Sequence, residues 1–154
     1  MKLALVAVGK VRDKGLAHLA DDYTKRIARF VPFVVHDVKD GRVKDAQVAK
    51  KLEGERLLGK LPAGAHVVLM DERGETLTSV QISERIDLWT RSGKRDVRFV
   101  LGGPDGFSSA VRSRANASWR LSSLTLPHEL ARVVLLEQVY RAWTILRGIP
   151  YHKD

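Results

Sequence analysis

The stretch "VRFVLGGPDGF", residues 97–107, joins a short apolar run to a loop that contains three glycines. Residues 97–101 are mostly β-branched or large and apolar, as in a strand that is buried on both faces of a sheet. The glycines lie on both sides of Pro104, so this backbone can adopt conformations that other residues avoid. Such a loop either turns the chain tightly into a helix or lets a ligand approach main-chain amides, and the motif alone leaves both interpretations open.

Three other segments have the same character as residues 97–101. They are "KLALVAV" (2–8), "FVVHDV" (33–38) and "HVVLM" (66–70). Each is short, rich in β-branched residues and bounded by glycine, proline or charge, which is typical of buried strands.

Helical periods fill the intervals between these strands. Apolar residues recur at helical spacing over 16–30, and residues 43–60 form a charged segment with a leucine face. Thr78 followed by Gln81 predicts a capping box for a helix that runs through Trp89. Alternating strands and helices, without internal repeats, predict a single α/β domain over residues 1–154, with a mainly parallel sheet flanked by helices. Ligands of such sheets bind beyond the carboxyl ends of the strands.

The last predicted helix, residues 129–147, is apolar in nearly every direction. A helix of this kind is buried on more than one side. Its second side faces either a partner subunit, most simply in a twofold dimer, or the core of the same chain. The pattern does not choose between these two.

Charge and composition restrict the class of protein. The 154 residues include 27 lysines and arginines against 18 acidic residues, a formal net charge of +9. This excess favours a polyanionic partner, most simply nucleic acid, because neutralised phosphates release counterions. The absence of cysteine excludes a disulfide scaffold and a thiolate nucleophile.

Targeting and membrane segments are not predicted. The first apolar run ends at Gly9 and Lys10 without a small-residue cleavage site, so a first strand is expected rather than a signal peptide. No stretch reaches the roughly 18 apolar residues of a membrane span. We therefore expect a cytoplasmic protein with no membrane contact.

Familiar nucleotide and metal motifs are missing. The glycine loop lacks the GxGxxG spacing, and GxxxxGK[ST] does not occur. His128 and Glu129 begin an HE pair, but Arg132 stands where a zinc-protease helix has its second histidine. The histidines show no ligand spacing, so we predict no metal site.

Three segments carry a resemblance that spans essentially the whole length. They are "KLALVAVGK" (2–10), "GGPDG" (102–106) and "LSSLTLPHELARVVLLEQVYRAWTILRGIPYHKD" (121–154). Together they resemble the RlmH family, the SPOUT-class methyltransferases that methylate N3 of a pseudouridine in 23S ribosomal RNA. The resemblance implies a C-terminal trefoil knot, a homodimer, S-adenosyl-L-methionine as cofactor, and ribosomal RNA in the ribosome or large subunit as substrate.

The same resemblance implies which residues contact the cofactor. They are Leu69, Met70, Gly102, Gly103, Leu121, Ser122, Ser123, Leu124, Thr125 and Leu126. We expect the hydroxyl side chains to satisfy backbone groups of an irregular loop, and the leucines to shield the adenine.

Methyl transfer to a ring nitrogen that carries a proton needs alignment and a way to lose that proton. The candidates near the substrate are His128, Arg132, Arg141, Tyr151 and His152, with no single base assigned. In this family the C-terminal tail completes the partner subunit's site. Two other interpretations stay open: a SPOUT relative with another RNA target, and a non-catalytic RNA-binding protein in which the glycine loop has no role.

Overall fold

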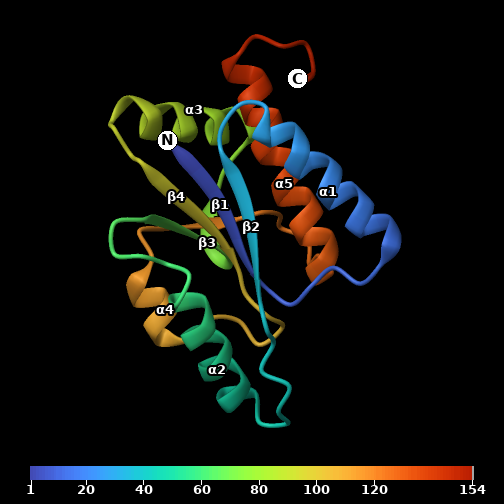
Figure 1. Ribbon diagram of the computed structural model, residues 1–154, viewed down its shortest axis with the longest axis vertical. Helices are drawn as coiled ribbons and strands as arrows, with labels where there is room; N and C mark the ends of the chain where they lie inside the picture. Colours follow the sequence, from blue (N-terminus) through green and yellow to red (C-terminus); the bar gives the residue numbers. More distant parts are fainter. Residues whose placement is uncertain (154) are drawn as a thin grey trace.

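Five parallel strands form one sheet in the computed structural model, in the order β2-β1-β4-β3-β5 (Figure 1). Their bounds are β1 Lys2–Val8, β2 Phe33–Val38, β3 His66–Thr76, β4 Asp96–Leu101 and β5 Ala117–Arg120. The structure describes residues 1–153, so Asp154, the last residue of the predicted domain, lies outside the described residues. Because all pairings are parallel, the carboxyl ends of the strands lie at one edge of the sheet, here called the carboxyl edge.

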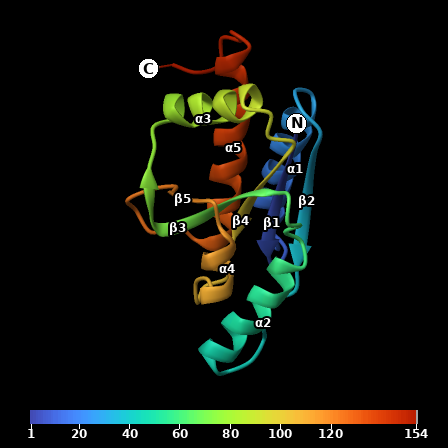
Figure 2. The same ribbon diagram turned by 90° about the vertical axis from the view of Figure 1, so that its left-hand side faces the viewer.

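Helices cover both faces of the sheet (Figures 1 and 2). Their bounds are α1 Lys14–Ala28, α2 Ala46–Leu58, α3 Ser79–Arg91, α4 Ser109–Arg114 and α5 His128–Leu146. Helices α1, α3 and α5 share one hydrophobic core with the sheet, and α2 and α4 share the other. The predicted α/β class with a parallel sheet flanked by helices is confirmed.

Strand β1 shows why the apolar runs form the centre of this sheet. Its side chains alternate between the two cores, with Leu5 facing α1 and α5 and Val6 facing α2. Both are fully buried. Strand β2 lies at the edge, where Val34 is 52% exposed. The uninterrupted apolar run therefore corresponds to a strand with neighbours on both sides.

Helix α5 packs between α1 and α3, and much of its apolar surface is buried within the same chain. Tyr140 contacts both Tyr23 and Phe30 of the α1 region, and the Phe30 ring stacks on Trp143. The core-helix interpretation is thus confirmed for these residues. Leu130, Val134 and Ile145 remain half-buried on the single chain.

The sequence patterns missed parts of the second half of the chain. Strand β3 continues beyond residue 70 to Thr76, with a register irregularity against β5 between Met70 and Glu75. Strand β5 and helix α4 were not predicted, because they are short and carry few apolar residues. Gly74 makes the close pairing possible, since a Cβ there would lie 2.6 Å from the carbonyl carbon of Trp119.

The capping box predicted at Thr78 is confirmed. The Thr78 hydroxyl accepts a hydrogen bond from the Gln81 amide at 3.1 Å, and the Gln81 side chain accepts one from the Thr78 amide at 2.8 Å. Among residues 1–153, no helix combines the length and the apolar character that a membrane crossing requires.

Candidate functional site

The predicted cofactor residues converge on three adjacent strands, inside β3 and just beyond the ends of β4 and β5. Met70 of β3 pairs with Leu101 of β4 on one side and with Trp119 of β5 on the other. Gly102 follows Leu101 directly, and Leu121 follows Trp119 by two residues. The sheet therefore brings Met70, the glycine loop (residues 102–106) and the 121–127 loop together, although they are far apart in the sequence.

Leu69 and Met70 present their side chains to opposite faces of the sheet. Leu69 is fully buried in the core with α2 and α4, and Met70 is 8% exposed in the core with α1, α3 and α5. Both side chains therefore pack within the hydrophobic cores. A ligand at this edge would meet their main chain.

The glycine loop is a tight turn with little room for side chains. The Gly106 amide donates to the Gly103 carbonyl at 3.1 Å, and Gly106 has a φ of +83°, a conformation that favours glycine. A Cβ on Gly102 would lie 2.9 Å from the Phe107 ring, and a Cβ on Gly103 would lie 2.5 Å from Glu53 Oε1. The turn interpretation is therefore correct, and at Gly102 and Gly103 the close packing leaves no space for a side chain.

Glu53 is a buried carboxylate that the sequence patterns did not single out. It is 4% exposed, and its Oε2 accepts the Gly41 amide at 2.9 Å. Its Oε1 has no hydrogen-bond partner among the described residues. Position 53 lies four residues from buried Ala49 and from buried Leu57, and this spacing places it on the inner face of α2. Glu53 thus joins the β2–α2 loop to the glycine loop.

The 121–127 loop is held by polar contacts of its own. The Arg120 side chain donates to the Ser122 carbonyl at 3.1 Å and to the Ser123 carbonyl at 3.3 Å. The Ser122 hydroxyl accepts the Leu124 amide at 2.9 Å, so the expectation that hydroxyls satisfy this backbone is confirmed at Ser122. Leu124 is 73% exposed, which leaves a large apolar side chain uncovered on the single chain.

His128 and Arg132, at the start of α5, tie that helix to the carboxyl edge. His128 Nε2 donates to the Val8 carbonyl at 2.8 Å. Arg132 is 4% exposed, and its guanidinium donates to Asp37 Oδ1 at 2.6 Å and to the Gly9 carbonyl at 2.8 Å. These two candidates therefore have a clear role in holding the ends of β1 and β2.

Arg141, Tyr151 and His152 form a second cluster around Glu137. Arg141 donates to Glu137 Oε1 at 3.0 and 2.6 Å, and the Tyr151 hydroxyl donates to the same oxygen at 2.9 Å. Another Arg141 nitrogen lies 3.1 Å from His152 Nδ1. Burial, with the hydrogen bond to Glu137 among its further causes, raises the pKa of Tyr151 well above its ordinary value, so the phenol stays protonated. The hydrogen bond with Glu137 likewise raises the pKa of Arg141.

One chain does not bring the two groups of candidates together. Thirteen residues separate His128 from Arg141 along α5, which corresponds to about 20 Å at 1.5 Å per residue. Figure 1 shows α5 running from the carboxyl edge to the opposite end of the molecule, where the tail lies. The tail is defined here as residues 147–153.

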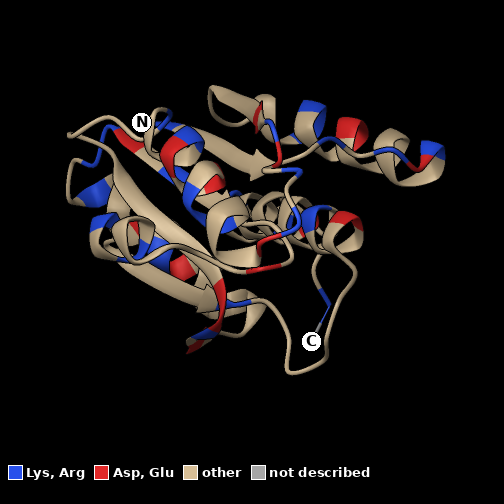
Figure 3. Ribbon diagram, turned by 90° about the horizontal axis from the view of Figure 1, so that it is seen from below, with Lys and Arg blue, Asp and Glu red and all other residues tan. Residues whose placement is uncertain are grey.

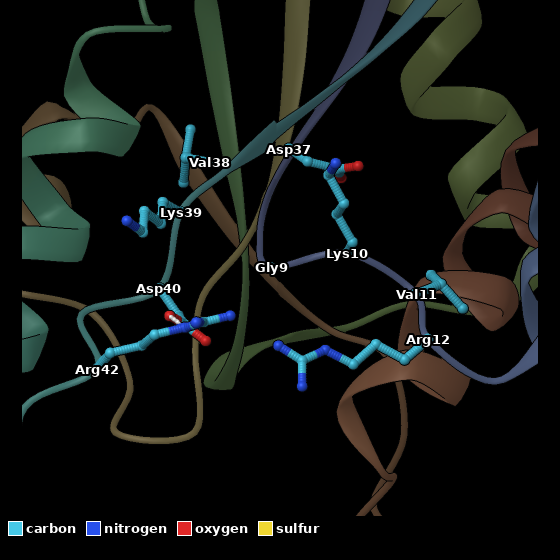
Figure 4. Close-up of a pocket in the computed structure, with 9 residues that line it drawn as sticks. All are labelled: Gly9, Lys10, Val11, Arg12, Asp37, Val38, Lys39, Asp40 and Arg42. Carbon is cyan, nitrogen blue, oxygen red and sulfur yellow. Dashed lines mark hydrogen bonds and ion pairs between the residues drawn. The ribbon is translucent and has the colours of Figure 1, made fainter.

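A basic cavity of about 550 Å³ opens at the carboxyl ends of β1 and β2 (Figure 4). Its lining comes from the ends of β1 and β2 and the loops that follow: Gly9, Lys10, Val11, Arg12, Asp37, Val38, Lys39, Asp40 and Arg42. Figure 3, which views the molecule from below in Figure 1, shows basic and acidic residues interleaved over several elements.

A smaller cavity of about 270 Å³ lies between the β3–α3 turn, β5 and α5, and includes Leu121. Among residues 1–153, no group of three or more histidine, aspartate or glutamate side chains is arranged to hold a metal ion.

This chain is similar to known proteins over nearly its whole length, including every residue of the site. The sequence model of a family described as "Predicted SPOUT methyltransferase" matches residues 1–152. Ribosomal RNA large subunit methyltransferase H of Anaeromyxobacter sp. (strain Fw109-5) is 47% identical over 154 residues, covering 99% of this chain and 100% of the relative. The protein of the same name from Hahella chejuensis is 42% identical over 157 residues, and the alignment covers 100% of both chains.

A solved structure of the SpoU methyltransferase AviRb from Streptomyces viridochromogenes, in complex with the cofactor AdoMet, aligns with a TM-score of 0.45 and 13% identity. The alignment covers 98% of this chain and 59% of that chain.

Proposed function

Because this chain belongs to the SPOUT methyltransferase family, we propose that it transfers the methyl group of S-adenosylmethionine to N3 of a pseudouridine in large-subunit ribosomal RNA. The substrate class follows from the name that the relatives carry, and the pseudouridine follows from the resemblance to the RlmH family. We further propose that residues 1–154 act as one domain with the C-terminal trefoil knot of that family, on assembled ribosomal particles in the cytoplasm.

The convergence of Met70, the glycine loop and the 121–127 loop carries this proposal. The glycine loop and the 121–127 loop follow the carboxyl ends of β4 and β5, where ligands of parallel sheets bind, and Met70 of β3 lies between those two ends. Gly102 and Gly103 have no room for a side chain, so their contacts with a ligand would come from main-chain amides and carbonyls. Such groups match the hydrogen-bonding edges of an adenine. We assign cofactor contact to the ten residues predicted from the resemblance, with Leu69 and Met70 acting through their main chain.

The proposed active unit is a homodimer, because Arg141 lies about 20 Å along α5 from His128 at the carboxyl edge of the same chain, and Tyr151 and His152 cluster with Arg141. A twofold arrangement would bring the tail of one subunit to the carboxyl edge of its partner. The same arrangement provides a cover for Leu124, which is 73% exposed on the single chain.

The chain's own residues have separable roles in this reaction. The cofactor would supply an activated sulfonium methyl, so the protein mainly orients the acceptor and handles the N3 proton. Arg141 is a fixed cation that would stabilise the anion developing when N3 loses its proton. Tyr151, whose pKa is raised, would donate a hydrogen bond rather than act as a base. His128 and Arg132 would maintain the carboxyl edge from α5.

Calorimetry with S-adenosylmethionine, alongside the mass in solution, tests the first step. We expect a dimer that binds up to one cofactor per chain, with binding lost in Gly103→Leu. Methyl transfer should then occur on large subunits that contain the pseudouridine and not on subunits with uridine at that position. A folded protein that binds no cofactor, alone or with subunits, would leave the non-catalytic RNA-binding alternative.

Mixed dimers test the shared site. Neither Gly103→Leu nor His152→Ala alone should support methyl transfer, whereas mixing the two variants should restore activity in heterodimers that contain one intact site. The absence of restored activity, with heterodimers verified by mass, would contradict a site completed by the partner.

A further inference from the structure

The basic cavity is lined by more lysine and arginine side chains than aspartate side chains. Both acidic residues that line it already have partners: Asp40 pairs with Arg42 at 2.8 Å, and Asp37 pairs with Arg132 at 2.6 Å. Among residues 1–153, the side chains of Lys10, Arg12 and Lys39 form no ion pair, and all three belong to the lining. The lining of the cavity therefore carries a net positive charge.

Two guanidiniums extend toward one another from opposite sides of this cavity. Figure 4 shows Arg12, on the β1–α1 loop, and Arg42, on the β2–α2 loop, in this arrangement, while Lys39 points away from them. Like charges directed at one space repel, unless an anion lies between them. A guanidinium presents a planar fork of donors that suits phosphate oxygens.

Both arginines are held in place by other residues. Glu129 Oε1 accepts the Arg12 amide at 2.9 Å and the Asp13 amide at 3.0 Å, which fixes the β1–α1 loop to the first turn of α5. Asp40 accepts a hydrogen bond from Nε of Arg42, and the terminal nitrogens of Arg42 form no hydrogen bond with the residues that the structure describes. Arg42 has a φ of 44°, the only left-handed non-glycine residue in the described part of the chain. Backbone conformations of this kind are costly and cluster at functional sites.

The cavity is adjacent to the proposed methyl-donor site. Strand β1 lies between β2 and β4, and Ala7 pairs with Leu101, the residue directly before the glycine loop; Gly9 of the cavity follows Ala7 by two residues. Glu53 connects the two regions further, because it accepts the amide of Gly41, next to Arg42, and packs against Gly103. An anion in the cavity would therefore lie beside a bound acceptor nucleotide.

We propose that the basic cavity binds a single backbone phosphate of the ribosomal RNA, next to the methylated nucleotide, between the guanidiniums of Arg12 and Arg42. This inference rests on the proposed function. The phosphate would neutralise the facing cations and fix the RNA strand, while the glycine and 121–127 loops hold the cofactor. The cavity would thereby set which nucleotide reaches the methyl group.

Methylation kinetics on unmethylated large ribosomal subunits test this site, with Arg12→Gln, Arg42→Gln and the double variant. We expect each single variant to raise KM for subunits about tenfold and to change kcat by less than about twofold. The salt dependence of binding, as log K against log salt, should become shallower by about one unit in each. Because both arginines hold one phosphate, the double variant should lose no more slope than either single variant.

Two further variants sharpen the result. Arg12→Lys keeps the charge and loses the fork, so it should retain the salt slope and still raise KM. Arg95→Gln is a matched control, because Arg95 is exposed and precedes β4 at the opposite edge of the sheet. It should behave as the unaltered protein does.

The outcomes separate this inference from the proposed function. If the unaltered protein binds no cofactor and transfers no methyl group, the proposed function fails. If it is active and Arg12→Gln and Arg42→Gln match it in KM and salt slope, the phosphate site alone is overturned. Weakened binding of S-adenosylmethionine in the same variants would also overturn it, because the cavity would then hold the carboxylate of the cofactor. A slope loss of two units in the double variant would refute the single shared phosphate.

Discussion

Replacing Gly103 by alanine tests whether Glu53 supports the glycine loop. The new methyl group would lie 2.5 Å from Glu53 Oε1 and 3.1 Å from Oε2, where ordinary contact begins at 3.4 Å. The nearer oxygen must therefore retreat by 3.4 minus 2.5, or 0.9 Å. Glu53 resists such a shift, because it is 4% exposed and its Oε2 holds the Gly41 amide at 2.9 Å.

Overpacking of this kind costs about 1–3 kcal/mol in free energy of unfolding. For a chain of this size, the corresponding fall in Tm is about 3–10 °C. The backbone of Gly103 is not left-handed, so the cost comes from the contact rather than from strain. We expect the affinity for S-adenosylmethionine to fall as well, because the loop must shift to accommodate the methyl group.

Urea unfolding of Gly103→Ala, Glu53→Ala and the double variant provides the measurement. In the Glu53→Ala background the space is free, so adding Gly103→Ala should cost less than about 0.5 kcal/mol. Gly106→Ala is the contrasting control. Its cost arises from a φ of +83° with no atom within 4 Å of the new methyl, so Glu53→Ala should not relieve it. Additive costs for Gly103→Ala and Glu53→Ala would refute the proposed support.

Three other predictions concern the frame of the site. Asp37→Asn should lower the free energy of unfolding by about 3 kcal/mol, because it leaves the Arg132 side chain, which is 5% exposed, without its carboxylate partner. Arg132→Met should lower it clearly less, because the Asp37 side chain that it leaves unpaired is 30% exposed. Urea unfolding measures both variants, and equal costs would contradict this prediction. Thr78→Ala removes a capping box and should cost about 1 kcal/mol by the same assay, and no loss would mean that the cap is dispensable. Burial lowers the pKa of His66, so protonation opposes folding: stability is complete above about pH 6.5 and declines as the pH falls further. His66→Phe should therefore lose less stability between pH 7 and 5 than the unaltered protein, as followed by Tm.

The helices and strands that were predicted well are those whose own sequence of apolar residues indicates how they are buried. Residues 2–8 form β1 because a strand with neighbours on both sides buries its side chains, here all those of residues 3–8, and this requires an uninterrupted apolar run. Strand β5, at the sheet edge, was missed because four residues with one buried side chain carry too little pattern. Its position depends on the extension of β3 to Thr76 and on the absence of a side chain at Gly74.

The candidate site was predicted in part for a similar reason. The glycine loop and residues 121–126 stand out locally, whereas the roles of Arg12, Arg42 and Glu53 depend on loops that only the fold brings together. Spacing alone did not separate Arg132 from Arg141 either. The first is buried against the ends of β1 and β2, and the second belongs to the cluster around Glu137.

Helix α5 constrains how this sequence can change. Its first turns are fixed to Val8 and Gly9, and its second half carries the Glu137 cluster and the contacts with α1. Inserting one residue between these regions would rotate everything beyond it by about 100° and advance it by about 1.5 Å. Insertions and deletions should therefore be excluded from the middle of α5, even where individual side chains there can be exchanged.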